Sequence, residues 1–244
     1  ENFGVQGDLP SHPGLLDWLA VQFVHDGWSL KTLHHRIMNS RTYRLSSRIS
    51  YGQATTDPQN RLLSSMPIRR LDAETLRDSI LFISGKLDLT AGGPPDAVSV
   101  NRDGLVSVMP RAGNGWRRSV YLQHRRTEIP SLLATFDYPV MGPNCLERNV
   151  SIVSTQPLML MNNQHIRELA AAFAARVKQQ TTDDGPRVEQ AYRIALSRLP
   201  SNAEKKLGIA ALQQLRRDWN GDVDAALTTY CHTLLNSAAF LYID

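Results

Sequence analysis

The chain has few cysteines and no long apolar run. Its 244 residues include two cysteines, Cys145 and Cys231, which are too few for a disulfide-rich scaffold or a four-cysteine zinc site. No apolar run reaches the ~18 residues that a membrane-spanning helix needs. The sequence therefore predicts a globular chain with no membrane span, and the redox state of its cysteines is left open.

Motifs for metals, nucleotides and haem are also missing. The sequence contains no HExxH, no GxSxG and no GxGxxG pattern, and no Cys-x-x-Cys pair precedes His232. The histidines are scattered, and the adjacent pair His34 and His35 would point ~100° apart on a helix. We therefore expect no metal site and no cofactor bound by this chain itself.

Lysine is scarce beside arginine. Only five of the 27 basic residues are lysines and the other 22 are arginines, with a formal net charge of +4. A guanidinium can grip a carboxylate or phosphate with two parallel hydrogen bonds. The bias is equally typical of a GC-rich genome, which favours arginine codons. Because the basic residues form no dense run and match no nucleic-acid motif, no nucleic-acid partner is expected.

The apolar pattern predicts a mainly α fold with a small β element. Helices at both ends flank a central irregular or hairpin region, in which Ser119–Val120–Tyr121–Leu122 is interpreted as a buried strand and 113–115 as a hairpin turn. We expect residues 1–180 to form a helical domain with an inserted extended segment at about 90–157. Residues 181–244 should add C-terminal helices on the same core. The expected whole is one domain truncated at its N-terminus. Helices are predicted at about 13–25, 29–43, 72–85, 157–180, 187–198, 202–218 and 222–240.

Residues 117–126 form the densest polar segment. Four guanidiniums near His124 could hold an anion such as a sulfate, phosphate or uronate carboxylate. Alternatively, each arginine pairs with a nearby acid such as Glu128, Asp137 or Glu147. The residues expected to bind a ligand are Arg118, His124, Arg125, Arg126 and Arg148, with Trp116 as a stacking face.

A second group of polar residues suggests catalysis instead. Asp137 follows a predicted helix end and precedes irregular backbone, where site residues concentrate. Together with His124 it could act as a general base, or it could be an ion-pair partner for an arginine. Cys145 is a candidate nucleophile only if a neighbouring charge such as Arg148 lowers the pKa of its thiol.

Taken in order, short motifs along nearly the whole chain resemble a planctomycete-associated family, domain of unknown function 1553. They include Gly27-Trp28-Ser29, Ser40-Arg41-Thr42-Tyr43-Arg44, Arg69-Arg70-Leu71-Asp72-Ala73-Glu74 and Arg117-Arg118-Ser119-Val120-Tyr121. Further matching segments are 1–4, 10–20, 57–62, 77–78, 84–88, 92–93, 136–137, 145, 148–149, 236–237 and 240–242.

The resemblance implies a setting rather than an activity. Members commonly lie at the C-terminal end of large exported proteins that often carry an upstream cytochrome c domain. It therefore implies an extracytoplasmic location, at the periplasm or cell surface, and haem c elsewhere in the parent protein. It also implies that preceding residues belong to the same domain.

Two functions follow as expectations. The first is an accessory or interaction module of a large exported multidomain protein, which binds an anionic polysaccharide or another domain of that protein through the arginine-rich centre. The alternative is a polysaccharide-acting hydrolase or lyase that uses Asp137 and His124.

Overall fold

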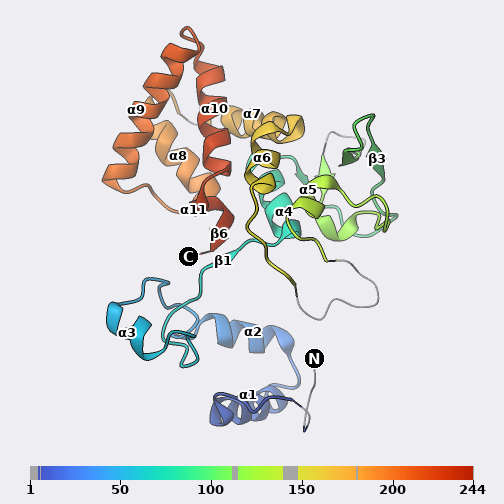
Figure 1. The fold of residues 1–244 in the computed structure, drawn as a ribbon, viewed down its shortest axis with the longest axis vertical. Helices are drawn as coiled ribbons and strands as arrows, with labels where there is room; N and C mark the ends of the chain where they lie inside the picture. Colours follow the sequence, from blue (N-terminus) through green and yellow to red (C-terminus); the bar gives the residue numbers. More distant parts are fainter. Residues whose placement is uncertain (1–4, 6, 112–114, 140–147, 180, 244) are drawn as a thin grey trace. The chain divides into compact units, whose positions relative to one another are not determined.

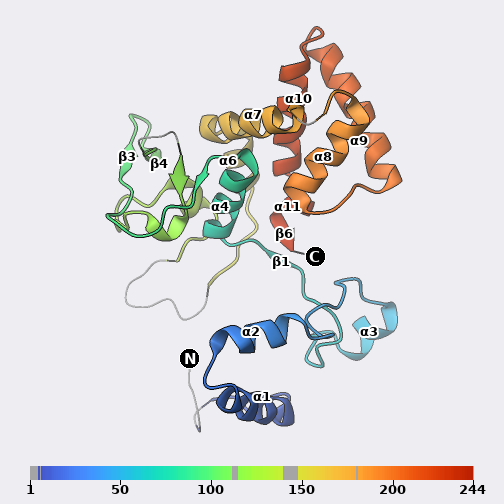
Figure 2. The same ribbon diagram turned by 180° about the vertical axis from the view of Figure 1, so that it is seen from behind.

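The computed structural model describes residues 5, 7–111, 115–139, 148–179 and 181–243 (Figures 1 and 2). By their contacts, these residues group into two compact units, one ending at Arg69 and the other comprising Arg70–Ile243. The expected single domain, with residues 181–244 packing on the same core, stays a prediction. No helix in the described ranges combines the length and the apolar character required to cross a bilayer.

The described residues of the first unit form three α-helices and their connections. They are α1 (Pro13–His25), α2 (Leu30–Met38) and α3 (Tyr51–Thr56). Ser29 caps α2 by accepting a hydrogen bond from the Thr32 N–H at 3.2 Å, as the sequence predicts. The tight turn between α1 and α2 places Gly27 and Trp28 at positive φ.

The second unit begins with α4 (Ala73–Ser84), whose limits are set by local chemistry. Asp72 caps its start by accepting the Thr75 N–H at 3.1 Å, and Gly85 ends it at φ +72°. The following elements are short: β2 (Leu87–Asp88), β3 (Val98–Val100), β4 (Val106–Val108), β5 (Trp116–Arg117), the 3-10 turn η2 (Ser119–Tyr121) and α5 (Ser131–Thr135). Here β3 and β4 form an antiparallel pair, whereas β2 and β5 pair in parallel.

Helices dominate the remainder of this unit. The elements are α6 (Thr155–Asn162), α7 (Gln164–Lys178), α8 (Asp184–Leu196), α9 (Asn202–Asp218), α10 (Val223–Leu235), α11 (Ala238–Leu241) and β6 (Tyr242–Ile243). The N–H of Leu71 donates to the carbonyl of Leu241 at 2.8 Å, so both ends of the unit meet beside β6. The fold is mainly helical with a small β element, which confirms the predicted class.

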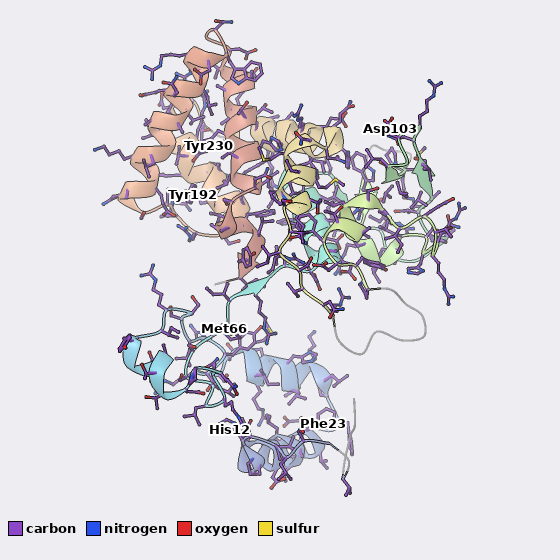
Figure 3. All side chains as sticks on the ribbon, viewed as in Figure 1. His12, Phe23, Met66, Asp103, Tyr192 and Tyr230 are labelled. Carbon is purple, nitrogen blue, oxygen red and sulfur yellow. The ribbon has the colours of Figure 1, made fainter. Side chains whose placement is uncertain are left out.

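One apolar core joins α4, α7 and the C-terminal helices. The stripe of α7 follows helical spacing, with Leu169, Phe173 and Val177 almost fully buried. From α4, Leu76 and Ile80 enter the same core, so this helix has one face fixed by packing. Figure 3 shows Tyr192 on α8 and Tyr230 on α10 among these C-terminal helices.

Several local predictions need correction. The helix expected over 29–43 ends at Met38, and the one expected over 222–240 is divided into α10 and α11. Residues 119–121 form a 3-10 turn rather than a strand, because Ser119 turns inward to hydrogen-bond with α4 while Val120 faces solvent. The helix expected over 157–180 is divided at Asn163, whose side chain caps α7 by accepting the Ile166 N–H at 3.2 Å. Of the predicted turn at 113–115, residues 113 and 114 lie outside the described residues, as does Cys145.

Candidate functional site

The second unit contains a cavity of about 850 Å³ beside α4, here called the α4 cleft. A volume of this size lies within the range of small-molecule and peptide-binding clefts. Its walls are the outer face of α4, the η2 turn and the C-terminal end of α8. The lining residues used below are Asp72, Glu74, Asp78, Phe82, Ile83, Leu87, Arg118, Ser119, Val120, His124, Tyr138, Arg148, Ile194 and Phe240.

The η2 turn is fixed to α4 by Asp78. Its Oδ1 accepts the Ser119 N–H at 2.8 Å and the Ser119 hydroxyl at 2.7 Å. Arg77 supports the turn from below, since its Nη1 donates to the Arg117 carbonyl at 3.0 Å and to Ser119 Oγ at 3.2 Å. Burial lowers the pKa of Arg77 to about 10, against the opposing effect of Asp78. This wall of the cleft is therefore positioned before any ligand arrives.

Arg148 closes the polar end of the cleft. Its Nη1 and Nη2 donate to the two carboxylate oxygens of Glu74 at 2.7 and 2.9 Å, and Asp72 lies 3.5 Å from Nη1. This two-point geometry is the strong form of an arginine–carboxylate pair. Arg148 is thus committed to acids at the start of α4, which are distant from it in sequence.

Arg118 is held much less tightly. Its Nε approaches Asp78 Oδ2 at 3.5 Å, and the side chain is 61% exposed. Within the described part of the chain, its Nη1 and Nη2 take part in no hydrogen bond. Arg118 therefore presents two guanidinium nitrogens, Nη1 and Nη2, whose N–H donors are unused, in the lining of the cleft.

His124 and Tyr138 lie side by side on the cleft wall. Their ring centroids are 5.9 Å apart with a 36° tilt. Burial raises the pKa of Tyr138 above its ordinary value, aided by Glu74 and opposed by Arg148. The phenol therefore stays protonated near neutrality and can serve as a hydrogen-bond donor.

Exposed apolar side chains line the cleft on the same two elements, α4 and the η2 turn. Phe82 is 59% exposed and Val120 is 74% exposed. Leu87, Ile83 and Phe240 also line the cleft. The cleft is therefore amphipathic, with both charge pairs and exposed apolar side chains in its lining.

Asp137, the candidate general base, does not line the cleft. Its Oδ1 accepts the Ser151 hydroxyl at 2.7 Å, and its Oδ2 accepts from Arg70 Nη2 at 2.6 Å and from the Ser151 N–H at 2.8 Å. Burial alone would raise the pKa of Asp137, but the hydrogen bonds from Arg70 and Ser151 outweigh it, and the net pKa is lowered. Among the described residues, no hydrogen bond joins Asp137 to His124, and the carboxylate already has partners on both oxygens.

The other residues predicted to bind a ligand lie outside the cleft lining. Arg125 pairs with Glu128 at 2.7 Å, while Arg126 is exposed. Trp116 donates from Nε1 to the Val108 carbonyl at 3.0 Å, and its ring centroid lies 4.5 Å from that of His165. The structure thus brings Arg118, His124 and Arg148 together and leaves Arg125, Arg126 and Trp116 elsewhere.

Sequence reasoning missed the acidic half of the cleft. Glu74 and Asp78 are four residues apart, which places them on one face of α4. This four-residue spacing within the helix predicted over 72–85 could have indicated that the two acids share a face. No group of three or more His, Cys, Asp or Glu side chains that could hold a metal occurs in the described ranges.

Comparison with known proteins gives one match. The family model described as PSD1, protein of unknown function (DUF1553), matches residues 1–212. No curated protein and no solved structure matches the chain significantly.

Proposed function

The chain belongs to the DUF1553 family, and we propose that it is a non-catalytic interaction module whose α4 cleft binds a polypeptide segment of another domain of its parent protein. Apolar side chains of that segment would pack on the Phe82 and Val120 wall. Its polar groups would meet the charge pairs that Arg118 and Arg148 form with the acids of α4.

The observation that carries this proposal is the exposure of Phe82 and Val120 beside polar groups that are already held in place. Val120 sits at the tip of a turn whose backbone is held by Asp78, so its exposure is imposed by the fold. Exposing a large apolar side chain in a concave site favours burial against a ligand, by about 25 cal/mol per Å² of apolar surface removed from water. A cleft with both walls fixed also loses little conformational entropy on binding.

A second candidate ligand is an anionic polysaccharide. The unused donors of Arg118 support it, because a sulfate or carboxylate accepts from a guanidinium in a two-point geometry. The three carboxylates of Asp72, Glu74 and Asp78 oppose it, since they outnumber the two arginines of the cleft and repel a polyanion. We therefore rank a polypeptide above a polyanion.

The hydrolase or lyase alternative has less geometric support. General-base catalysis needs a carboxylate that can reach a substrate proton. The oxygens of Asp137 are instead engaged by Arg70 and Ser151.

The proposal also includes the setting implied by the family resemblance. We place the module outside the cytoplasm, at the periplasm or cell surface. It would act beside other domains of the parent protein, where an upstream domain would carry haem c.

The test compares two classes of ligand on the same chain. A library of linear peptides and an array of sulfated and uronate glycans are screened against the 244-residue chain. We expect cleft-binding peptides to lose affinity by about tenfold or more in Val120→Asp, because a carboxylate there adds charge to the apolar wall. Leu207→Asp, at a 71% exposed position of α9, should leave their binding unchanged.

The arginine pair separates the two ligand classes. Arg118→Ala should abolish binding of an anionic glycan, whereas Arg126→Ala should not, because Arg118 lines the cleft and Arg126 does not. Glycan binding that depends on Arg118 would replace the polypeptide with a polyanion. If neither class shows binding that depends on Val120 or Arg118, the proposed function is wrong.

A further inference from the structure

The first unit contains a second concave surface, separate from the α4 cleft. Its cavity measures about 650 Å³ and lies beside α1 and α2. We call it the α1–α2 pocket. Its apolar lining is Leu15, Trp18, Leu19, Ile37, Tyr43, Leu63, Met66 and Pro67, and its polar lining is Arg36, Ser40, Thr42, Gln59, Asn60, Ser65 and Arg69.

The apolar residues around this pocket lack a core of their own. Among the described residues of the first unit, none is buried to the extent of a core residue. Trp18 remains 49% exposed and Leu16 56% exposed on α1, and Met38 is 55% exposed on α2. Helices with such faces normally bury them against another element. The exposed apolar surface also extends beyond the pocket, which favours a macromolecular occupant over a small molecule.

The two helices are nonetheless held together in a defined arrangement. Arg36 on α2 donates to Gln22 Oε1 at 2.7 Å and to Asp26 Oδ2 at 2.6 Å, reaching across to α1 and its end. The same guanidinium lies 5.7 Å from the ring centroid of Trp18. Figure 3 labels Phe23 on α1 and Met66 in the segment after α3. The pocket is thus lined by two helices that hydrogen bonds from Arg36 hold together.

Unpaired positive charge surrounds this apolar surface. Within the described part of the unit, Arg41, Arg44 and Arg69 have no side-chain hydrogen bond or ion pair, and all three are exposed. Of the four acids in the described part of this unit, Asp26 pairs with Arg36 and Asp57 accepts the backbone N–H groups of residues 61 and 62, whereas Asp8 and Asp17 take part in no side-chain hydrogen bond or ion pair. Arg69 lines the pocket itself, and Arg41 and Arg44 flank its residues Thr42 and Tyr43. Unlike Arg117 and Arg148, these guanidiniums keep their donors for another molecule.

We propose that the α1–α2 pocket docks an amphipathic helix with acidic flanks, contributed by a partner polypeptide. Its apolar face would pack between α1 and α2, as a third helix packs into the groove of a helix pair. Its carboxylates would meet Arg41, Arg44 and Arg69. The 13 residues of α1 span about 20 Å, which matches a helix of similar length in the partner. This proposal is independent of the α4 cleft and its ligand.

The experiment uses two synthetic helical peptides as probes. Both carry leucines at the same helical spacing, one with glutamates and the other with lysines on its flanks. Binding of each labelled peptide to the full chain is measured by fluorescence anisotropy at low and at physiological salt. The acidic peptide should bind at least about tenfold more tightly than the basic one, and the difference should shrink as salt screens the charges.

Variants then locate the binding surface. Ile37→Glu, at an exposed position in the pocket, should weaken binding of the acidic peptide by about tenfold or more. Arg69→Glu should reduce the preference for the acidic peptide. Leu207→Glu on α9 is the matched control and should change nothing, and circular dichroism checks that each variant is folded.

Three outcomes would overturn the proposal. Equal affinity for both peptides would contradict the proposal that the partner helix has acidic flanks. Binding unaffected by Ile37→Glu would move the site away from the pocket. Concentration-dependent dimerisation that Ile37→Glu abolishes would make a second copy of this chain the occupant.

Discussion

Arg117 and Asp96 form a fully enclosed ion pair. Arg117 is 0% exposed; its Nε and Nη2 donate to Asp96 Oδ1 at 3.0 and 2.8 Å. The remaining donors reach the carbonyls of Gly92 at 2.5 Å and Pro94 at 2.6 Å, and the guanidinium lies 4.7 Å from the Tyr121 ring centroid. The arginine therefore ties the loop that follows β2 to strand β5.

Arg117→Lys should strongly destabilise the second unit. A lysine keeps the charge but cannot supply the planar fork that serves Asp96 and two carbonyls at once. Thermal unfolding should begin well below that of the parent chain, and the double variant Arg117→Met/Asp96→Asn should recover part of the loss, because no unpaired charge remains. Equal melting temperatures for parent and Arg117→Lys would contradict this assignment.

Asp137→Asn tests a structural role for the candidate general base. The change removes the negative charge opposite Arg70, while Asn tolerates the positive φ of 63° at this position. We expect a loss of about 1–3 kcal/mol in the free energy of unfolding near neutral pH. Chemical denaturation measures it, and any peptide affinity of the α4 cleft should persist.

The pH dependence gives an independent check on Asp137. Because its pKa in the folded chain is lowered from 3.8, its contribution to stability is present above that value and is lost as pH falls through the folded pKa. The stability difference between the parent chain and Asp137→Asn should therefore shrink only in acid. A constant difference down to the lowest pH at which the chain folds would refute the interpretation.

Gly208→Ala should destabilise the contact of α9 with α8 and α10. A Cβ at this position would lie 2.7 Å from Tyr230 Oη and 2.9 Å from a Val188 methyl. The clash should outweigh the gain in helix propensity and cost about 0.5–2 kcal/mol net. Gly185→Ala is the matched control, since its Cβ would meet nothing closer than 3.5 Å. Denaturation midpoints that fall equally for both would contradict the packing account.

Glu204 should stabilise the start of α9 in a pH-dependent way. Hydrogen bonds from Arg198 and from the Ser201 N–H lower its pKa from 4.5 to about 2. Its contribution is therefore complete above pH 4.5 and is lost as pH falls toward about 2. Glu204→Gln keeps the capping geometry but removes the charge, and should cost ~0.5–1 kcal/mol at neutral pH because the pair is partly exposed. Melting curves of both chains should converge in acid.

The thiol of Cys231 should be inert while the chain is folded. Cys231 is fully buried on α10, and burial raises its pKa well above the ordinary range. In a Cys145→Ser background, a thiol reagent at about pH 8 should react ~100-fold more slowly than in denaturant. Rapid labelling of the native chain would show that α10 opens readily.

The starts of several helices were predictable from the sequence because they depend on local capping residues. Asp72, Ser29 and Asp222 were recognisable caps, and each accepts the expected backbone hydrogen bonds. The 3-10 turn at Ser119 was not predictable, because its cause is Asp78, 41 residues earlier in the chain. An apolar and aromatic tetrapeptide has strand propensity, and a distant carboxylate overrode it.

The candidate site was predictable only in part, for the same reason. Arg118, His124 and Arg148 were identified by residue type, but the acids that engage the two arginines lie on α4, far away in sequence. The sequence also could not show which arginines have partners. Arg41, Arg44 and Arg69 keep unused donors in the first unit, as Arg118 does in the second, and residue type alone could not distinguish them from Arg117 or Arg148.

The helix α4 both packs into the core and lines the cleft, which has a consequence for the kinetics of ligand binding. Leu76 and Ile80 anchor this helix in the interior while Glu74 and Asp78 face the opening. Binding to the cleft should require no slow rearrangement of the protein. The observed association rate should therefore rise in proportion to ligand concentration. Natural variation at the inward positions should consequently tune affinity without touching any residue that a ligand meets.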